Sequence, residues 1–211
     1  MTETYLSSLL SLLVIAFALT AVAPASAQVL YTNGPINGET DGWTINFGYT
    51  VNDSFNIMSG LSTIGGLSFG AWLTPGDTLQ SVEVFISSEP FGGTVYYDEH
   101  VNIAQSGCFL NNYSYDVCTE TASFHGPTLN NGMYWISLEN AVSVDGSPVY
   151  WDENSGPSEA CLGSCLGTIP SESFTILGNG SSTGTTPEPS SLVLLSSGLL
   201  GAVGILRRKH A

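Results

Sequence analysis

The sequence has almost no positive charge, with 3 Lys and Arg against 18 Asp and Glu in 211 residues. All three bases lie at 207–209, so residues 28–186 contain no Lys or Arg. Nucleic-acid-binding proteins neutralise phosphates with cationic side chains, and anionic lipid headgroups attract the same side chains. The composition therefore excludes a nucleic-acid partner for this region. It leaves neutral or cationic partners: polysaccharide hydroxyls, divalent metals or basic proteins.

Recognisable catalytic motifs are also missing. There is no nucleophile elbow, P-loop, dinucleotide fingerprint or zincin helix, and the glycine-rich stretch at 61–70 is not followed by a helical pattern. A glycosidase would need two carboxylates across a cleft, and the sixteen acids between 28 and 186 neither exclude nor identify such a pair. We therefore expect a protein that is not an enzyme and that needs no cofactor.

The N-terminus has the pattern of a secretory signal peptide. Residues 9–19 are apolar apart from Ser11, and the run is too short to span a bilayer. Small residues at Ala25 and Ala27 then precede Gln28. This order predicts a signal peptide over residues 1–27, cut before Gln28.

The C-terminus contains a second apolar stretch, residues 190–206, followed directly by Arg207, Arg208 and Lys209. As a helix this stretch would be about 25 Å long, near the lower limit for crossing a hydrocarbon core of about 30 Å. Basic residues stay on the cytoplasmic side, so the large domain would lie outside. A Gly/Ser/Thr linker at 178–186 precedes this segment and predicts a flexible tether.

Between linker and apolar stretch stand Pro187, Glu188 and Pro189, where the prolines favour an extended, accessible backbone. This motif, the apolar stretch with "GLLG" at 198–201 and the basic cluster together resemble the PEP-CTERM sorting domain, a segment also labelled ice-binding protein C-terminal domain. The resemblance covers 187–209 and implies bacterial export, temporary attachment to the inner membrane and recognition by an exosortase. It further implies processing near Pro187–Pro189 and delivery to the cell surface or an exopolysaccharide matrix. It implies nothing about ice or about the rest of the chain.

The exported region, residues 28–177, is typical of an all-β domain. Short β-branched and aromatic segments alternate with Gly, Pro, Asn and Asp, and no segment keeps a helical period. In "SVEVFIS" the side chains of Val82, Val84 and Ile86 fall on one face. The pattern predicts an antiparallel β-sandwich or jelly roll. The predicted strands are 43–51, 66–73, 79–87, 93–103, 117–124, 132–139, 148–152 and 173–177.

Four cysteines, at 108, 118, 161 and 165, suggest two disulfides in an exported chain, although the sequence permits three pairings. We favour the local pairs Cys108–Cys118 and Cys161–Cys165. Zinc is the alternative, but Cys161 and Cys165 have no neighbouring His.

Two acidic stretches are candidates for a binding site. In "YYDEHVN" a strand would place Asp98 and His100 on one face, with Glu99 on the other. This pair could supply metal ligands or acid–base groups, and it could equally be part of a polar solvent face.

The second stretch is "YWDENSGPSEA", residues 150–160. The rings of Tyr150 and Trp151 beside Asp152 and Asn154 could bind a sugar by stacking and hydrogen bonds. Alternatively Asp152, Asn154 and Glu159 could hold Ca²⁺, although the spacing of a calcium loop is missing. In the remaining alternative Trp151 anchors the core and the acids are solvated.

These observations favour an exported surface or matrix protein, sorted through its C-terminus, whose partners are an exosortase-type enzyme and an extracellular polysaccharide. A carbohydrate-binding module and an exported hydrolase are the two alternatives for residues 28–177.

Overall fold

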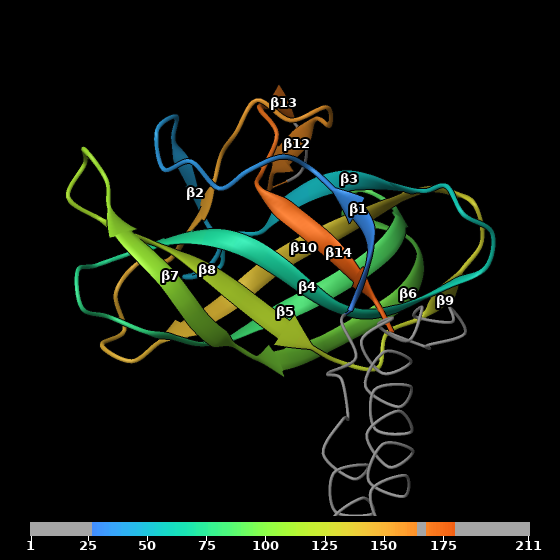
Figure 1. Cartoon of the computed structure of the whole chain (residues 1–211), viewed down its shortest axis with the longest axis horizontal. Helices are drawn as coiled ribbons and strands as arrows, with labels where there is room; N and C mark the ends of the chain where they lie inside the picture. The colour runs from blue at the N-terminus through green and yellow to red at the C-terminus, as the bar shows by residue number, and fades with distance from the viewer. Residues whose placement is uncertain (1–26, 164–167, 180–211) are drawn as a thin grey trace, which may run out of the picture. The chain divides into compact units, whose positions relative to one another are not determined.

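The computed structural model describes residues 27–163 and 168–179, which form an all-β unit with no helix (Figure 1). The predicted all-β class is thus confirmed. The predicted signal peptide, the linker and the sorting segment lie outside the described residues. No helix in the described part of the chain is long and apolar enough to cross a membrane.

Two antiparallel sheets enclose one core and curl toward each other like a half-open barrel (Figure 1). The eight-stranded sheet has the order β1-β14-β4-β11-β2, with β8 and β9 pairing with β4 and β7 with β8. Its strands are β1 (Gln28–Thr32), β2 (Gly42–Thr44), β4 (Ser62–Leu73), β7 (Ala104–Leu110), β8 (Asp116–Ser123), β9 (Thr128–Leu129), β11 (Tyr150–Asp152) and β14 (Phe174–Gly178).

The six-stranded sheet has the order β13-β12-β3-β10-β5-β6. Its strands are β3 (Val51–Ile57), β5 (Leu79–Glu89), β6 (Gly92–Asn102), β10 (Gly132–Ser143), β12 (Ala160–Leu162) and β13 (Thr168–Ile169). Within β5 the predicted alternation is confirmed, because Val82, Val84 and Ile86 are fully buried. The core lies between such inward faces of the two sheets.

Strand β4 is buried along most of its length because both of its faces are covered. Phe69, Ala71 and Leu73 point into the core. On the opposite face, Gly70 lies against Ser173, Asp152 and Ile36, and a Cβ atom there would approach each of them to 2.6–2.8 Å. A segment before β2 therefore lies directly on β4, and only glycine leaves room for it.

One predicted strand is wrong in extent. The stretch 43–51 was expected to be continuous, but β2 ends at Thr44 and β3 begins at Val51. Between them Phe47 and Gly48 have φ angles of 56° and 84°, and the Tyr49 N–H donates to the carbonyl of Asn46. A turn with two left-handed residues cannot continue a strand, so the chain crosses here to the other sheet.

The disulfide Cys108–Cys118 joins β7 to β8, as the sequence predicted. Cys161 also forms a disulfide, and its predicted partner, Cys165, lies outside the described residues. The first bridge joins β7 and β8 near the turn of their hairpin, and this turn carries Tyr113 and Tyr115.

Candidate aromatic binding site

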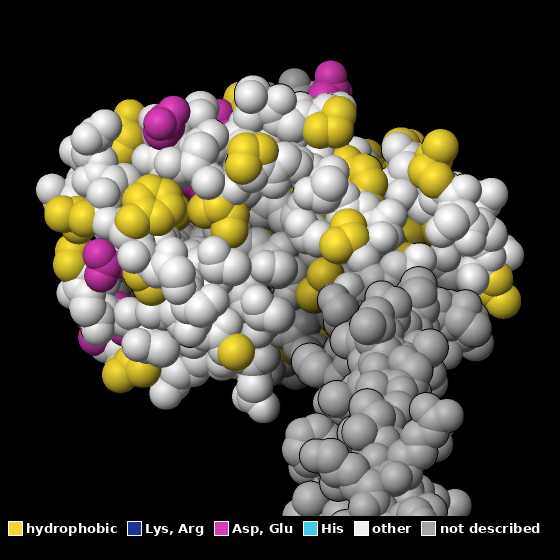
Figure 2. Space-filling model, in the orientation of Figure 1, with side chains coloured by type: hydrophobic (Ala, Val, Ile, Leu, Met, Phe, Trp, Pro, Cys, Tyr) yellow, Lys and Arg dark blue, Asp and Glu magenta, His cyan; other side chains and the backbone are white. Residues whose placement is uncertain are grey.

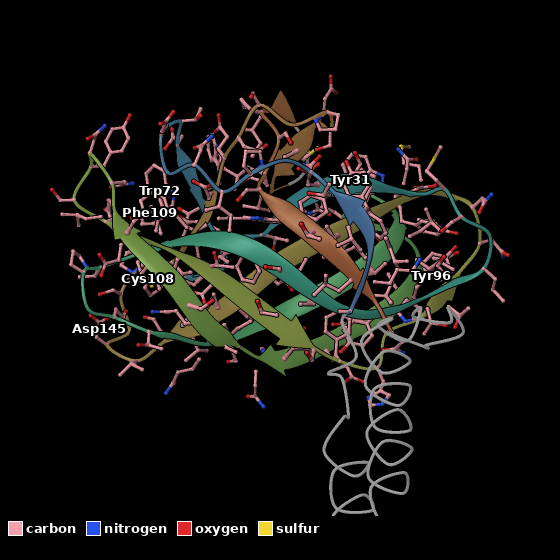
Figure 3. All side chains as sticks on the ribbon, in the orientation of Figure 1. Tyr31, Trp72, Tyr96, Cys108, Phe109 and Asp145 are labelled. Atoms are coloured by element: carbon pink, nitrogen blue, oxygen red, sulfur yellow. A yellow bond between two sulfur atoms is a disulfide. The ribbon has the colours of Figure 1, made fainter. Side chains whose placement is uncertain are left out.

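An aromatic hollow of about 260 Å³ lies on the outer side of the eight-stranded sheet. We define it by the rings of Trp72, Tyr113, Tyr115 and Tyr150, which line it together with residues 40–42. Trp72 and Tyr150 are direct neighbours in the β4–β11 register and project away from the core. Figure 3 shows Trp72 near the tip of the β7–β8 hairpin.

The hairpin turn supplies the other two rings. The Asn111 side chain accepts hydrogen bonds from the N–H groups of Tyr113 and Tyr115, each at 3.0 Å. Tyr113 stacks on Trp72 with 5.5 Å between ring centroids, and Tyr115 meets Tyr150 edge-on at 5.4 Å. Three separate chain segments therefore build one aromatic surface.

The hollow offers ring faces, phenol hydroxyls and one carboxylate, and it contains no cationic group. Tyr113 keeps more than half of its surface exposed, whereas Trp72 is almost completely buried beneath it. Burial, followed by the neighbouring phenol of Tyr115, raises the pKa of Tyr150. The Tyr150 phenol consequently remains an uncharged hydrogen-bonding group at neutral pH, suited to an uncharged polar ligand with a flat apolar face.

Asp152 supports the hollow from behind. Its buried carboxylate accepts hydrogen bonds from the indole N–H of Trp72 at 2.6 Å and from the N–H groups of Gly38 and Asn37 at 2.9 and 3.0 Å. Burial raises the pKa of Asp152, and these donors lower it in part. Asp152 thus fixes Trp72 and the preceding loop, and contacts no solvent itself.

The site predicted at 150–154 is therefore corrected. Of its four residues only Tyr150 lines the hollow. Trp151 is fully buried, packs edge-on against Phe69 and Phe174, and donates its indole N–H to the Ser173 carbonyl at 3.0 Å. It has no free face for a sugar ring, because neighbouring strand residues point to opposite faces and Trp151 points inward.

Asn154 is also structural, since its side-chain amide donates to the carbonyls of Asn33 and Pro35 at 2.8 and 3.2 Å. Asp152 and Asn154 were expected as calcium ligands, but their side chains are engaged in these internal hydrogen bonds. The third expected ligand, Glu159, is exposed. Within the described residues no group of three or more His, Cys, Asp or Glu side chains is arranged to hold a metal ion.

Further buried carboxylates lie beneath this region. Glu153 and Glu172 face each other across an isolated antiparallel bridge, and the Trp43 indole donates to Glu153 at 2.8 Å. Asp53 accepts from the Glu172 N–H at 2.8 Å and from Asn33 at 3.0 Å, and burial raises its pKa to about 6. Glu172 is fully buried, and burial followed by the charges of Asp53 and Glu153 raises its pKa well above its usual range. These acids are inaccessible to a substrate, so we assign them a structural role.

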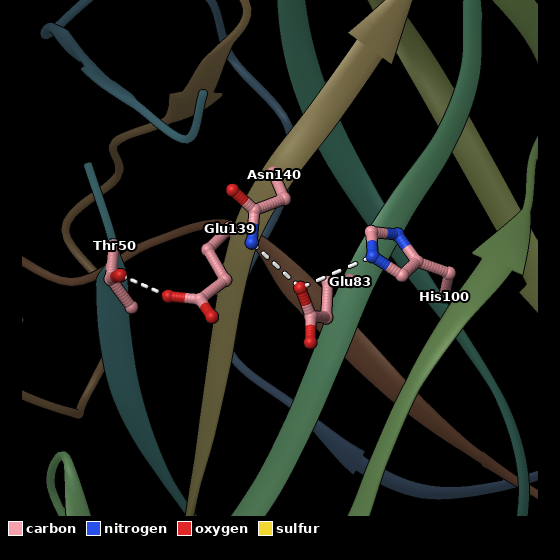
Figure 4. Close-up of polar contacts among 5 residues, drawn as sticks. All are labelled: Thr50, Glu83, His100, Glu139 and Asn140. Atoms are coloured by element: carbon pink, nitrogen blue, oxygen red, sulfur yellow. Dashed lines mark hydrogen bonds and ion pairs between the residues drawn. The ribbon is translucent and has the colours of Figure 1, made fainter. Parts of the chain in front are cut away.

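A row of polar side chains crosses the outer face of the six-stranded sheet (Figure 4). Glu139 pairs in register with Glu83, and Glu83 pairs with His100. Glu139 accepts a hydrogen bond from Thr50, while Glu83 accepts one from Asn140 at 2.7 Å and lies 3.3 Å from the His100 imidazole.

The predicted pair of Asp98 and His100 thus belongs to a larger group that includes Glu83. Burial and then Glu83 raise the pKa of Asp98, and His100 lowers it. Both glutamates in the row are held by neighbouring side chains, so we do not assign the catalytic pair of a hydrolase to it.

The sequence pattern did not identify Trp72, Tyr113 and Tyr115 as site residues. The only local signal is "NNYSYD", in which two tyrosines follow a turn-forming asparagine. Their proximity to Tyr150 depends on the pairing of β4 with both β8 and β11.

Comparison with curated proteins found no match to this chain. A family comparison matches the C-terminal end of the chain, which lies outside the described residues. There, residues 185–209 match the family model of the PEP-CTERM protein-sorting motif, in agreement with the resemblance noted in the sequence.

Proposed function

We propose that the protein is a non-enzymatic surface or matrix protein, exported through its signal peptide and sorted through its C-terminus. The matched motif at 185–209 carries this proposal. An exosortase-type enzyme would recognise the precursor while residues 190–206 hold it in the inner membrane, and would process it near Pro187–Pro189. The disulfide Cys108–Cys118 and the acidic region 28–186, which lacks Lys and Arg, are consistent with an oxidising compartment outside the cytoplasm.

Two tail variants test the sorting step. Glu188→Ala leaves the apolar stretch and its charges intact, so the precursor should insert and then accumulate at full length in the membrane. Neutralising Arg207, Arg208 and Lys209 removes the topology signal, so part of the protein should pass through the membrane unprocessed. Fractionation and mass spectrometry separate these outcomes. If Glu188→Ala is processed and delivered like the parent, the motif is not a processing signal in this protein.

For the ectodomain we propose carbohydrate binding in the aromatic hollow. The observation that favours it is the grouping of four rings with phenol hydroxyls around 260 Å³ of space, next to Asp41 and without any cation. Sugar rings present an apolar face to aromatic side chains and hydroxyls to polar groups. The absence of bases favours neutral or amino-sugar polymers over anionic ones.

Gel retardation in polysaccharide-containing gels tests this binding. Tyr113→Ala should weaken binding by at least about 1 kcal/mol, as expected for an aromatic residue at the centre of a binding site. Tyr49→Ala is the matched control, because Tyr49 and Tyr113 are 54% and 56% exposed and Tyr49 lies outside the hollow. Equal retardation of both variants and the parent would exclude the hollow as the binding site.

A further inference from the structure

The two ends of the described domain leave it at the same place. Gln28, the first residue of β1, pairs with Gly178, the last residue of β14, and Gly178 pairs in turn with Ile64 near the start of β4. The chain on both sides therefore connects to one end of the sandwich, which Figure 1 shows where β1 begins and β14 ends.

Exposed apolar side chains are gathered at this end. In register, Gly132 pairs with Ile57, and Ser62 pairs with Leu129, so the loop 58–61 lies beside the start of β10. We define the apolar end by four residues that are 80%, 70%, 58% and 57% exposed: Met58, Leu61, Met133 and Val29. Four exposed apolar side chains therefore surround the place where the chain leaves the domain.

Acidic residues are scarce at the apolar end. The segments 54–76, 121–138 and 173–187 contain no Asp or Glu, and the Glu89 turn flanks the apolar end. In the face that Figure 2 shows, no acidic side chain lies at the right-hand end, where the β3–β4 loop and β9 are found in Figure 1.

The far end of the sandwich is acidic. There the N–H of Asp145 donates to Asp77, and the N–H of Gly76 donates to Asp116. This end also exposes apolar residues such as Leu110 and Val144, so its acids are what distinguishes it from the apolar end. The domain has no Lys or Arg to compensate these acids.

We propose that the apolar end rests on the membrane interface while the precursor is anchored. This proposal rests on the proposed function, because it requires residues 190–206 to insert in the bilayer. Eleven residues, 179–189, connect Gly178 to that stretch, and their contour length is at most about 40 Å. The chain exit is thus tethered within about 40 Å of the lipid surface.

The partner that fits the apolar end is a lipid surface, because this end meets two requirements for membrane contact. Met58, Leu61 and Met133 can enter the boundary between headgroups and acyl chains, which buries apolar surface. The segments that form the apolar end contain no acid apart from the flanking Glu89, so anionic headgroups meet little repulsion there. Contact would present the uncleaved Pro187–Pro189 segment close to the bilayer, where a membrane-embedded processing enzyme acts.

Methionine oxidation can test the contact, because Met58 and Met133 are natural reporters. The full chain carrying Val144→Met is reconstituted in phosphatidylethanolamine–phosphatidylglycerol vesicles, recovered by flotation and treated with chloramine-T, which does not cross the bilayer. Val144 is 63% exposed and follows the other end of β10, so the introduced methionine reports the far end of the same molecule. Peptide mass spectrometry then compares three oxidation rates.

We expect Met58 and Met133 to oxidise about tenfold more slowly than the introduced methionine. This ratio corresponds to roughly nine molecules in ten having their apolar end on the lipid surface, where the oxidant cannot reach these two side chains. Leu61→Asp should abolish the protection of Met133, because a carboxylate at the lipid boundary is costly. Leu110→Asp, at a 64% exposed position in the far hairpin, should leave the protection unchanged.

The possible failures are distinguishable. If the floated chain oxidises equally fast at all three positions, the contact does not exist and the anchor is unaffected. If the chain does not float with the vesicles, the anchor of the proposed function fails, and the contact fails with it.

Discussion

The indole N–H of Trp72 donates to the buried carboxylate of Asp152 with 2.6 Å between Nε1 and Oδ1. This bond joins the aromatic hollow to the loop at 37–38, because the same carboxylate accepts two backbone N–H groups there. One buried acid therefore sets the position of a ring that comes from a different strand.

Replacing Asp152 by alanine should destabilise the domain by about 2–4 kcal/mol, because three donors, two of them buried, lose their acceptor. Urea unfolding measures the change, and polysaccharide retardation should weaken in the same variant. Glu159→Ala, which removes an exposed acid from the same loop region, is the control and should change neither quantity. An Asp152→Ala protein as stable as the parent would show that the three donors find other acceptors.

Glu120 should make stability decrease as pH rises. Its side chain is fully buried without a hydrogen-bond partner and lies beside Phe69 in the β4–β8 register. Burial raises its pKa from 4.5 to about 8. The folded state therefore keeps a proton that the unfolded chain has lost, so this contribution to stability is complete below pH 4.5 and disappears as pH rises to about 8.

Substitution of Glu120 by methionine should remove this contribution to the pH dependence and stabilise the protein at pH 8. The gain is at most about 5 kcal/mol, at about 1.4 kcal/mol for each pKa unit. Thermal unfolding between pH 4.5 and pH 8 checks it, with Glu159→Gln as the exposed control. A parent protein whose stability is flat over this range would contradict a proton held on Glu120.

Removing the disulfide Cys108–Cys118 should cost about 3 kcal/mol, the loop-closure entropy of a short loop. The double variant to alanine is preferable to serine because Cys118 is buried in the core. Since the bridge closes the hairpin that carries Tyr113 and Tyr115, polysaccharide retardation should also decrease. Thermal unfolding of the double variant gives the cost, and peptide mapping with an Asp/Glu-directed protease verifies the parent bridge. Free thiols at 108 and 118 in the exported protein would refute it.

The exported protein should begin at Gln28. Cleavage there leaves β1 complete, because the strand starts at the same residue. N-terminal sequencing or intact-mass measurement of the exported form gives the answer. Ala27→Leu should block cleavage, because signal peptidases require a small residue before the cut. An exported protein that retains Met1 would be incompatible with this prediction.

Local patterns predicted several features directly. The alternation of Val82, Val84 and Ile86 assigned β5 and its inward face, because successive side chains of a strand alternate regardless of their partners. The pairing of Cys108 with Cys118 was accessible because their short separation fits a hairpin. The motif at 185–209 could be recognised because a sorting signal is a linear sequence motif.

Such local patterns did not predict the candidate site. From the sequence "YWDEN", Tyr150 and Trp151 were equally good candidates for a ring that stacks on a sugar. In the structure, the register of β11 with β4 turns Tyr150 outward and buries Trp151. Whether a strand residue meets solvent depends on which sheet face is covered, and that is a property of long-range packing. The loop at 37–38 covers Asp152 for the same reason.

The sequence by itself determined the class of fold, the sorting motif at 185–209 and the lack of Lys and Arg between residues 28 and 186. These follow from composition and from short linear patterns, which act locally. Only the tertiary structure decided that Trp72, Tyr113, Tyr115 and Tyr150 share one hollow, and that four exposed apolar residues surround the chain exit while Asp77, Asp116 and Asp145 lie at the other end. Both outcomes depend on strand pairing between segments far apart in the chain, and pairing is selected by how the whole core packs.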